Sequence, residues 1–319
     1  MMDQVIRDFS KQFSYQPTIT NAGKLKKRTG FVVSGMGGSH LAADILQTVT
    51  PQLDIIIHRD YGLPGVELSK RLCIASSYSG NTEEVVDGLQ QAIKRKLAVA
   101  VVAVGGKLIT IAKKNNLPFV ELPAVGIQPR SALGFSFRGL AKLMGLTTLL
   151  KQSAALATQL QPNKLEPEGK ALAQRFFGRV PVIYASARNY SVAYNWKIKF
   201  NETGKIPAFC NVIPELNHNE MQGFDIRPTT KKLGSLFTFI FLRDSADHPR
   251  IQKRMGILEQ QLRRRQLPVT SLTMTGTTKL EKVFQSLLLA DWAAFYTAKR
   301  YGLEPEAVPM IEEFKKKMK

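Results

Sequence analysis

The sequence contains little of the material that builds metal centres, disulfide frameworks or membrane spans. It has two cysteines and four histidines in 319 residues. The histidines are too scattered to form a ligand-spaced metal cluster. Cys73 and Cys210 allow at most one disulfide, and their apolar neighbours favour buried cytosolic thiols. No window approaches the ~18 uninterrupted apolar residues of a membrane span. The N-terminus, MMDQVIRDFSKQF, is charged where a signal peptide is apolar. We therefore expect a cytoplasmic protein without metal or membrane.

Acidic residues are also scarce, with 25 against 45 basic residues and a net charge of +20. One interpretation is a nucleic-acid surface. However, the basic residues occur in short, scattered groups that are not interleaved with aromatic residues as in a stacking platform. The other interpretation is solvated basic faces, and we favour it over a nucleic-acid partner. The main consequence of the charge is then attraction of anionic substrates.

Two halves of the chain show the same alternation of short apolar runs and amphipathic stretches. At 44% hydrophobic and 22% charged residues, the composition is that of a globular protein. Strands are expected at 30–34, 53–58, 71–76, 98–104 and 119–122, and again at 180–185, 208–212, 236–242 and 268–274. Helices are expected from 41 and at 82–94, 193–200, 251–266 and 280–301. Such alternation predicts a doubly wound parallel α/β sheet in each half. The polar stretch 151–169 carries two prolines, so we predict domains at 1–152 and 153–319.

Two loops in the first half have the composition of an anion site. GMGGSH at 35–40 follows one expected strand, and SSYSGNTEE at 76–84 follows another and opens a helix. Glycines allow the backbone to approach a ligand, and a helix N-terminus attracts negative charge. The spacing fits neither a dinucleotide fingerprint nor a Walker motif, so a phosphate monoester is predicted. Helix capping by Ser79 or Thr82 is an alternative that is compatible with this site.

The segment 195–224 in the second half combines an acid and an imidazole with apolar surroundings. It contains Glu202 and His218. Much of the segment should be buried through its large apolar residues, which are Trp196, Phe200, Phe209, Val212, Ile213 and Leu216. A carboxyl and an imidazole in such surroundings suit proton transfer. Two structural groups satisfied by hydrogen bonds are the alternative.

Four ordered motifs carry a family resemblance that covers nearly the whole chain: GMGGS, SYSGNTEE, QPRSALGFSF, and FNETGKIPAF followed by PELNHNE. They resemble the bifunctional phosphoglucose/phosphomannose isomerases, a branch of the phosphoglucose isomerase superfamily with the sugar-isomerase (SIS) fold. The resemblance implies two flavodoxin-like SIS subdomains and a C-terminal helix. It also implies an aldose–ketose isomerase of glycolysis and gluconeogenesis that needs no cofactor. Its substrates would be glucose 6-phosphate and/or mannose 6-phosphate, interconverted with fructose 6-phosphate through a cis-enediol.

The resemblance also implies roles for individual residues. Glu202 matches the base that moves a proton between C1 and C2. His218 matches the group that opens the sugar ring, and in this superfamily it reaches across a homodimer interface. Arg130 matches the arginine beside the enediolate, where its fixed charge would stabilise the transition state. Six residues match those that bind the sugar phosphate, namely Gly37, Gly38, Ser39, Ser77, Ser79 and Thr82.

Three positions fit the family pattern less closely. Lys299 is the candidate for the superfamily's lysine at the ring oxygen, although a lysine near a helix end is often solvated. Thr297 is a nearby hydroxyl residue without an assigned role. His40 stands where the family usually has glycine, and its ring either points away from the sugar or narrows the site.

The alternative function is a non-catalytic SIS-type sensor of sugar phosphates. A sensor needs the phosphate loop but no base, so the presence of Glu202, His218 and Arg130 together argues against it.

Overall fold

The computed structural model describes residues 2–318, which contain nine strands in two parallel sheets. The chain divides into an N-terminal unit, Arg7–Leu160, and a C-terminal unit, Gln161–Lys319 together with Met1–Ile6. The predicted division between 152 and 153 would cut helix α6 (Thr147–Gln159). This helix packs on the 3₁₀ helix η1 (Phe9–Ser14) of the N-terminal unit, so all of it stays with that unit.

The N-terminal unit is built on a five-stranded sheet in the order β2-β1-β3-β4-β5. All neighbouring strands are parallel. Every residue of β1 and β4 is buried, as expected for central strands covered on both faces. The strands are β1 (Gly30–Ser34), β2 (Asp54–His58), β3 (Arg71–Ser76), β4 (Ala98–Ala103) and β5 (Phe119–Glu121).

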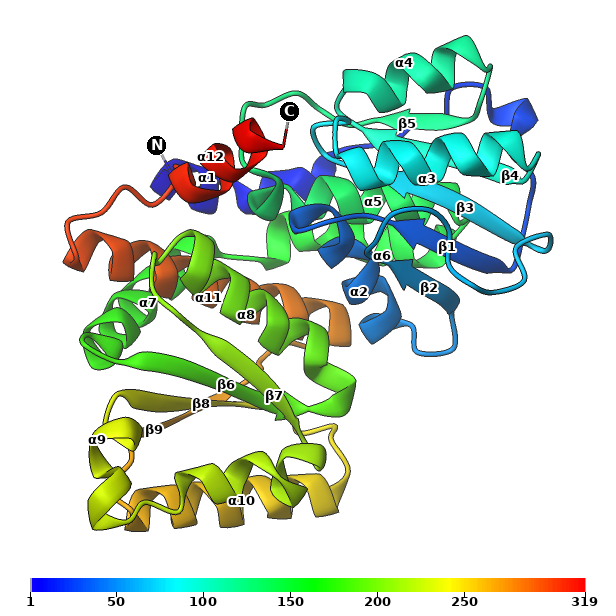
Figure 1. The fold of residues 1–319 in the computed structure, drawn as a ribbon. Helices are drawn as coiled ribbons and strands as arrows, with labels where there is room; N and C mark the ends of the chain where they lie inside the picture. The colour runs from blue at the N-terminus through cyan, green and yellow to red at the C-terminus, as the bar shows by residue number, and fades with distance from the viewer. Residues whose placement is uncertain (1, 319) are drawn as a thin grey trace. The chain divides into compact units, whose positions relative to one another are not determined.

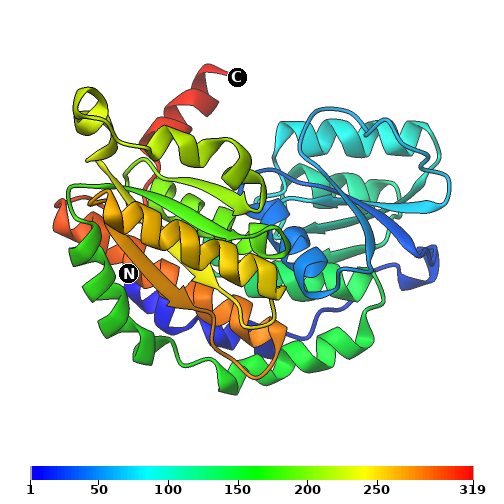
Figure 2. The same ribbon diagram turned by 90° about the horizontal axis from the view of Figure 1, so that it is seen from below.

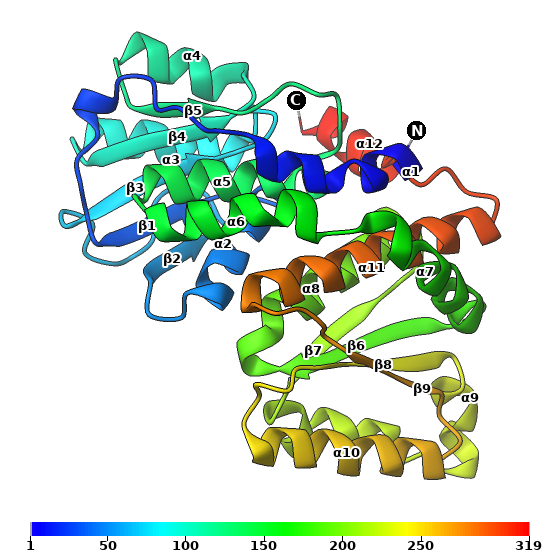
Figure 3. The same ribbon diagram turned by 180° about the vertical axis from the view of Figure 1, so that it is seen from behind.

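Helices cover both faces of this sheet (Figures 1 and 3). One face is covered by α3 (Glu83–Lys94) and α4 (Gly106–Lys114), which pack on β3 and β4. The other face is covered by α2 (Gly38–Val49), α5 (Leu133–Leu143) and α6. The strand order and the two helical layers make this a flavodoxin-like doubly wound sheet, which confirms the predicted fold class.

The C-terminal unit repeats the topology with a four-stranded parallel sheet in the order β7-β6-β8-β9. Its strands are β6 (Val180–Ser186), β7 (Phe209–Ile213), β8 (Phe237–Arg243) and β9 (Val269–Thr273). Strand for strand, β6, β7, β8 and β9 take the places of β1, β2, β3 and β4. The internal repeat of fold predicted from the sequence is therefore present.

The C-terminal sheet is also covered on both faces. Helices α7 (Pro162–Phe176), α8 (Tyr190–Glu202) and α11 (Lys279–Arg300) pack together on one side, and α10 (Pro249–Arg264) lies along the other side (Figure 2). The remaining helices are α1 (Met2–Arg7), α9 (Lys231–Gly234) and α12 (Pro309–Lys317).

Burial of the segment 195–224 follows the prediction at most positions. Trp196, Phe200, Ile213 and Leu216 have no exposed surface. The prediction is wrong for Phe209, which is 54% exposed. Phe209 is the first residue of β7, and β7 is an edge strand with a neighbour on one side only.

Candidate active site

The glycines of GMGGS serve two different purposes. Gly37 precedes α2 with φ +51° and ψ −126°, a conformation that favours glycine, although a side chain would have space. Gly38 is needed for close approach. A β-carbon at Gly38 would lie 2.7 Å from the backbone nitrogen of Arg130 and 2.8 Å from the carbonyl carbon of Pro129. The missing side chain therefore allows the segment that carries Arg130 to lie directly against the start of α2.

The two predicted anion loops are joined by two hydrogen bonds that Ser39 accepts. The backbone N–H of Tyr78 donates to the Ser39 hydroxyl oxygen at 2.9 Å. The Ser76 hydroxyl donates to the Ser39 carbonyl oxygen at 3.1 Å. Ser39 is 5% exposed, so it fixes the loop after β1 to the loop after β3.

The hydroxyls of SYSGNT do not cap helix α3. Thr82 is the N-cap residue, but its side chain makes no capping hydrogen bond. Instead its hydroxyl lies 2.7 Å from the Ser77 hydroxyl. The exposed Ser79 hydroxyl accepts from the N–H of Asn81 at 3.3 Å. Because Thr82 leaves the first turn of α3 uncapped, this turn is suited to an anion.

Gly80 and Asn81 attach this loop to the start of α4. Gly80 has φ +72°, and a β-carbon there would lie 1.8 Å from the Gly105 carbonyl oxygen. The Asn81 side-chain oxygen accepts from the N–H of Lys107 at 3.0 Å. The Gly80 carbonyl accepts from the N–H of Leu108 at 2.9 Å. These two residues therefore fix the position of the loop against α4.

Arg130 lies in the short helix η3 (Pro129–Ser131) and is 2% exposed. Gln12, itself buried, holds the chain just beyond it. The Gln12 amide donates to the Ser131 carbonyl at 2.7 Å, and its side-chain oxygen accepts from the N–H of Gly134 at 2.9 Å. Sequence reasoning missed Gln12 because an isolated glutamine outside every motif gives no signal of its role.

His40 is buried within α2. Its Nδ1 lies 2.6 Å from an Asp44 carboxylate oxygen, one helical turn further on. The other Asp44 oxygen accepts from Arg59 at 2.6 Å. This arrangement favours the first alternative, in which the ring is held along the helix.

Glu202 is the last residue of α8 and is partly buried. Two buried polar contacts fasten α8 to α11. The Lys199 ammonium lies 2.6 Å from Asp291 Oδ1, and the Trp196 indole N–H donates to the Ser286 hydroxyl at 3.0 Å. Because a buried ion pair requires well-defined geometry, these contacts fix the helix end that carries Glu202.

Lys205 holds the turn after Glu202. Its ammonium donates to the Glu202 carbonyl oxygen and, at 3.2 Å, to the Pro305 carbonyl oxygen. It also donates to the carbonyl oxygen of Ala307. Lys205 therefore ties the end of α8 to the segment that precedes α12.

His218 is exposed and lies in the short helix η5 (Glu215–His218), which is followed by η6 (Glu220–Phe224). Glu220 anchors this segment to the sheet. It accepts from the Tyr184 hydroxyl at 2.6 Å and from the Asn211 amide at 2.5 Å. Burial, together with this bond to Glu220, raises the pKa of Tyr184 far above its ordinary value, so the phenol stays a donor. Glu220 is thus a positioning residue; it ends the motif PELNHNE, but the sequence indicated no role for it.

Lys299 is exposed in the last turn of α11, and its ammonium lies 5.6 Å from the centre of the Phe295 ring. Thr297 is buried, and its hydroxyl donates to the Ala293 carbonyl one turn earlier at 2.7 Å. The Thr297 hydroxyl is thus bonded to its own helix.

The whole chain is similar to a known isomerase. It is 30% identical over 320 residues to a bifunctional phosphoglucose/phosphomannose isomerase of Aquifex aeolicus, covering 99% of this chain and 98% of the relative. The chain belongs to the bifunctional phosphoglucose/phosphomannose isomerase family. A protein of the same name from Caldicellulosiruptor bescii is 33% identical over 306 residues, covering 90% of this chain and 88% of that relative. Residues 165–318 match the bacterial phospho-glucose isomerase C-terminal SIS domain.

The fold of this isomerase family member is also similar to solved SIS structures. Tagatose-6-phosphate ketose/aldose isomerase from Escherichia coli superposes with a TM-score of 0.70 at 17% identity, covering 96% of this chain and 94% of that one. At this identity the likeness shows the fold alone.

In this isomerase, the predicted phosphate residues and Arg130 belong to the N-terminal unit, where the loops that carry them contact one another. Glu202, His218 and Lys299 belong to the C-terminal unit and lie on three different elements. Among residues 2–318, no group of three or more histidine, cysteine, aspartate or glutamate side chains could hold a metal ion. In that same part of the chain, no helix is long and apolar enough to cross a membrane.

Proposed function

We propose that the protein interconverts glucose 6-phosphate and/or mannose 6-phosphate with fructose 6-phosphate. The observation that carries this proposal is the similarity to isomerases of that name along 99% of the chain, with Glu202, His218 and Arg130 all present. The phosphate is bound by Ser77, Ser79 and Thr82 and by the N–H groups at the start of α3. Gly37, Gly38 and Ser39 supply a backbone edge for the sugar.

The proposed reaction begins with opening of the pyranose ring. His218 gives a proton to the ring oxygen as the C1–O5 bond breaks, and the C1 hydroxyl loses its proton to form the aldehyde. Lys299 is the second candidate at this oxygen, and its exposure on the last turn of α11 leaves it free to move.

Isomerisation then requires transfer of one proton between neighbouring carbons. Glu202 removes the C2 proton while O1 takes up a proton, which leaves a cis-enediol. It then returns its proton to C1 as the O2 hydroxyl loses its proton, which gives the ketose. Negative charge develops on the oxygens during this step, and the buried guanidinium of Arg130 stabilises it. One carbon is reduced as its neighbour is oxidised within the same sugar, so the reaction requires no external oxidant or reductant.

We also propose a cytoplasmic homodimer in which His218 serves the partner's site. Its exposure on a short helix is compatible with this role.

A coupled assay with each 6-phosphate in the presence of a chelator tests the proposal. Glu202→Gln should lower kcat by about 10²–10⁴-fold, the usual contribution of a positioned base. Glu312→Gln, which neutralises an exposed carboxylate of the same unit, should retain full activity. Full activity of Glu202→Gln would refute the base assignment, and an inactive wild type would favour the sensor.

A further inference from the structure

A buried amide near the start of the chain bonds to the segment that carries Arg130. Gln12 lies in η1 and is 3% exposed. Its side-chain nitrogen donates to the Ser131 carbonyl oxygen at 2.7 Å. Its side-chain oxygen accepts from the N–H of Gly134 at 2.9 Å and from the N–H of Phe135 at 3.4 Å. Both polar atoms of one side chain are therefore used on the residues just after Arg130.

Gln12 takes the place of a cap on helix α5. The first N–H groups of a helix have no partner within the helix. The N-cap residue of α5 is Ala132, whose side chain makes no capping hydrogen bond. The Gln12 oxygen accepts from the first turn instead, while its nitrogen is used on Ser131. A carboxylate could not donate to the Ser131 carbonyl, so the two tasks together require an amide.

The packing around Gln12 is shaped to admit it. A β-carbon at Gly134 would lie 2.7 Å from the Gln12 β-carbon and 3.0 Å from Gln12 Oε1, so glycine leaves the space that Gln12 occupies. Phe9 and Phe13, on either side in η1, are 2% and 0% exposed. The short helix is thus held in the core by its own apolar side chains, and it presents Gln12 to α5.

The Arg130 backbone lies between this contact and the start of α2. A β-carbon at Gly38 would lie 2.7 Å from the Arg130 nitrogen, so the two backbones are already as close as glycine allows. On the following side, Gln12 bonds to the next residue, Ser131. Because η3 contains only three residues, 129–131, a shift of Ser131 carries Arg130 with it.

We propose that Gln12 is a positioning residue of the isomerase, which fixes where the Arg130 guanidinium meets the enediolate. Negative charge develops on the sugar oxygens only during the proton transfer. A cation fixed at that place therefore lowers the barrier without binding the substrate more tightly. The phosphate is bound by residues 77–82, whereas the side-chain contacts of Gln12 go to residues 131–135. This inference rests on the proposed role of Arg130.

Gln12→Met tests the inference, since methionine has a similar length but neither the donor nor the strong acceptor of an amide. It should lower kcat by about tenfold to a hundredfold, because misplacement of a reacting group by about 1 Å can cost that much. KM for either 6-phosphate should change by less than about twofold. An unchanged kcat would overturn the proposal. A loss that appears in KM alone would also overturn it, because it would mean weaker binding of the substrate in general.

Arg138→Met separates positioning from stability. Arg138 also joins the N-terminal segment to α5, but away from Arg130. Its guanidinium donates to the Tyr15 carbonyl oxygen at 2.5 Å and to the Ser153 hydroxyl at 2.7 Å, and the residue is 2% exposed. Both variants should therefore lower the melting temperature, but only Gln12→Met should lower kcat at a temperature where both are folded. Equal losses of kcat would mean that any loosening of the segment suffices, and would overturn the specific role.

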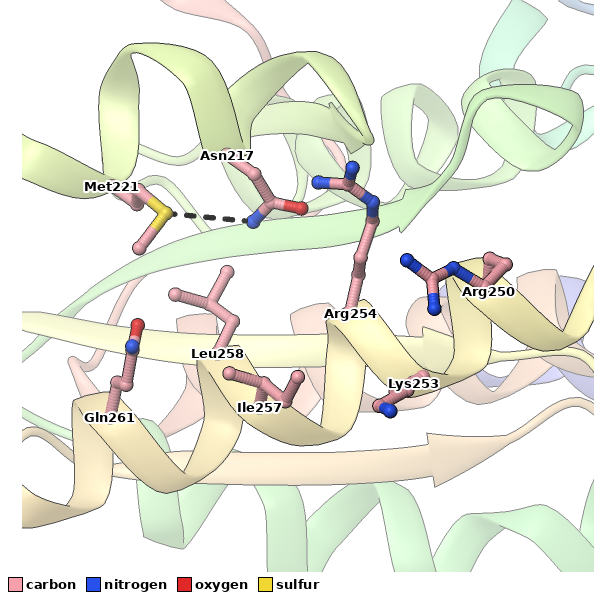
Figure 4. Close-up of a pocket in the computed structure, with 8 residues that line it drawn as sticks. All are labelled: Asn217, Met221, Arg250, Lys253, Arg254, Ile257, Leu258 and Gln261. Atoms are coloured by element: carbon pink, nitrogen blue, oxygen red, sulfur yellow. Dashed lines mark hydrogen bonds between the residues drawn. The ribbon is translucent and has the colours of Figure 1, made fainter.

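Two further variants complete the kinetic comparison. Gln261→Met makes the same chemical change at a half-buried glutamine of α10, beside a pocket of the C-terminal unit (Figure 4). It should leave kcat and KM unchanged. Gly134→Ala keeps Gln12 but takes the space that it occupies, so it should reproduce the loss of kcat. Full activity of Gly134→Ala would show that Gln12 need not keep its place and would overturn the proposal.

Binding of an enediolate analogue tests Gln12 apart from catalysis. 5-Phosphoarabinonate has a planar, anionic carboxylate where the enediolate would lie, whereas sorbitol 6-phosphate is uncharged there. By calorimetry, Gln12→Met should bind the first about tenfold more weakly and the second within about twofold of wild type. Equal weakening of both ligands would overturn the proposal. If the wild type binds both ligands but does not isomerise glucose 6-phosphate or mannose 6-phosphate, the proposed function fails, while these titrations still decide the role of Gln12.

Discussion

The loops after β3 and β8 occupy the same place in two sheets of the same topology, yet their chemistry is opposite. After β3, hydroxyls and backbone N–H groups of residues 77–82 surround the start of a helix. After β8, the corresponding loop begins with Asp244 and contains Asp247. Both carboxylates are buried. One copy of the fold is thus suited to an external anion, and the other already contains its own anions.

The carboxylates after β8 are held by cations and amides of the same unit. Asp244 lies 2.9 Å from the ammonium groups of both Lys279 and Lys282. The Ser186 hydroxyl donates to Asp247 at 2.7 Å. A phosphate that entered this loop would meet two carboxylates whose cations are already paired. Duplication of a sheet therefore does not duplicate its binding site, because loop composition decides which charge is accepted.

Of the changes in the two compared loops, Gly80→Ala in the N-terminal loop should have the largest effect on activity. The new β-carbon cannot fit 1.8 Å from the Gly105 carbonyl oxygen, so the phosphate loop must move. Misplacement by about 1 Å can lower kcat/KM by about a hundredfold. Gly145→Ala is the matched control, since Gly145 has φ +71° and nothing within 4 Å of a β-carbon. Similar losses in both variants would attribute the effect to backbone strain in general.

Asp244→Asn in the C-terminal loop should destabilise the protein by about 2–4 kcal/mol, because it leaves two partly buried lysines without a charge partner. Thermal and denaturant unfolding measure this change. Asp54→Asn breaks a pair with Arg71 in which the carboxylate is 58% exposed, and it should cost less than about 1 kcal/mol. Equal costs would show that burial does not distinguish the two pairs.

The pH dependence of Asp244 follows from its ion pairs. Burial acts to raise the pKa of Asp244, but hydrogen bonds from Lys282 and Lys279 outweigh it and lower the pKa below the usual value of 3.8. A carboxyl whose folded pKa is depressed stabilises the fold above its unfolded pKa and loses this contribution as pH falls through the folded value. The stability difference between wild type and Asp244→Asn should therefore shrink only below about pH 4. A stability difference that disappears near pH 6 would contradict this prediction.

Asp247→Asn should change stability in the opposite direction and by less. Burial raises the pKa of Asp247, despite the hydrogen bond from Ser186, and repulsion from Asp244 adds to the shift. At neutral pH the buried Asp247 carboxylate therefore destabilises the folded state. The neutral asparagine amide removes this destabilisation, so the free energy of unfolding should rise by up to about 1 kcal/mol. Since the wild-type group is neutral below about pH 4 in both states, the gain should vanish there. Destabilisation at pH 7 would refute this prediction.

The smallest effect concerns one cysteine in each sheet. Both thiols are free, Cys73 on β3 and Cys210 on β7. Burial raises the pKa of Cys73, and it raises the pKa of Cys210 to about 11. Since the thiolate is the reactive form, alkylation by iodoacetamide at pH 7 should be slower than for free cysteine at both positions. Rapid labelling of either thiol in the folded protein would count against the prediction.

Much of the fold and the anion loop after β3 could be predicted from the sequence, because both depend on local signals. Short apolar runs predicted all nine strands of residues 2–318 to within a few residues, and SYSGNT identified the anion loop. The stretch 151–169, where the boundary between the two halves was predicted, contains the division between the two units. Pro162 is the first residue of α7, a position that proline favours, and Pro167 lies inside the same helix. The predicted boundary region is therefore largely helical.

The contacts that position the candidate site could not be predicted, since they join residues far apart in the chain. Gln12 holds residues 131–134, and Glu220 bonds to Tyr184 on β6. Neither residue belongs to a periodic pattern. Gly38 was identified as part of a ligand loop, but its closeness to the Arg130 backbone depends on tertiary packing. A sequence motif thus identifies residue types suited to a function, whereas their orientation depends on contacts between residues far apart in the chain.

The Lys205 contacts have a consequence for how the protein is handled. The Lys205 ammonium donates to the carbonyl oxygens of Glu202, Pro305 and Ala307. The proposed base and the segment before α12 are therefore held by the same side chain. Proteolytic cleavage after α11 would break the contacts of Lys205 with Pro305 and Ala307 while both sheets stay folded. Such a nicked preparation would show unchanged secondary structure but a lower kcat, and a tag that strains α12 would imitate a defect in catalysis.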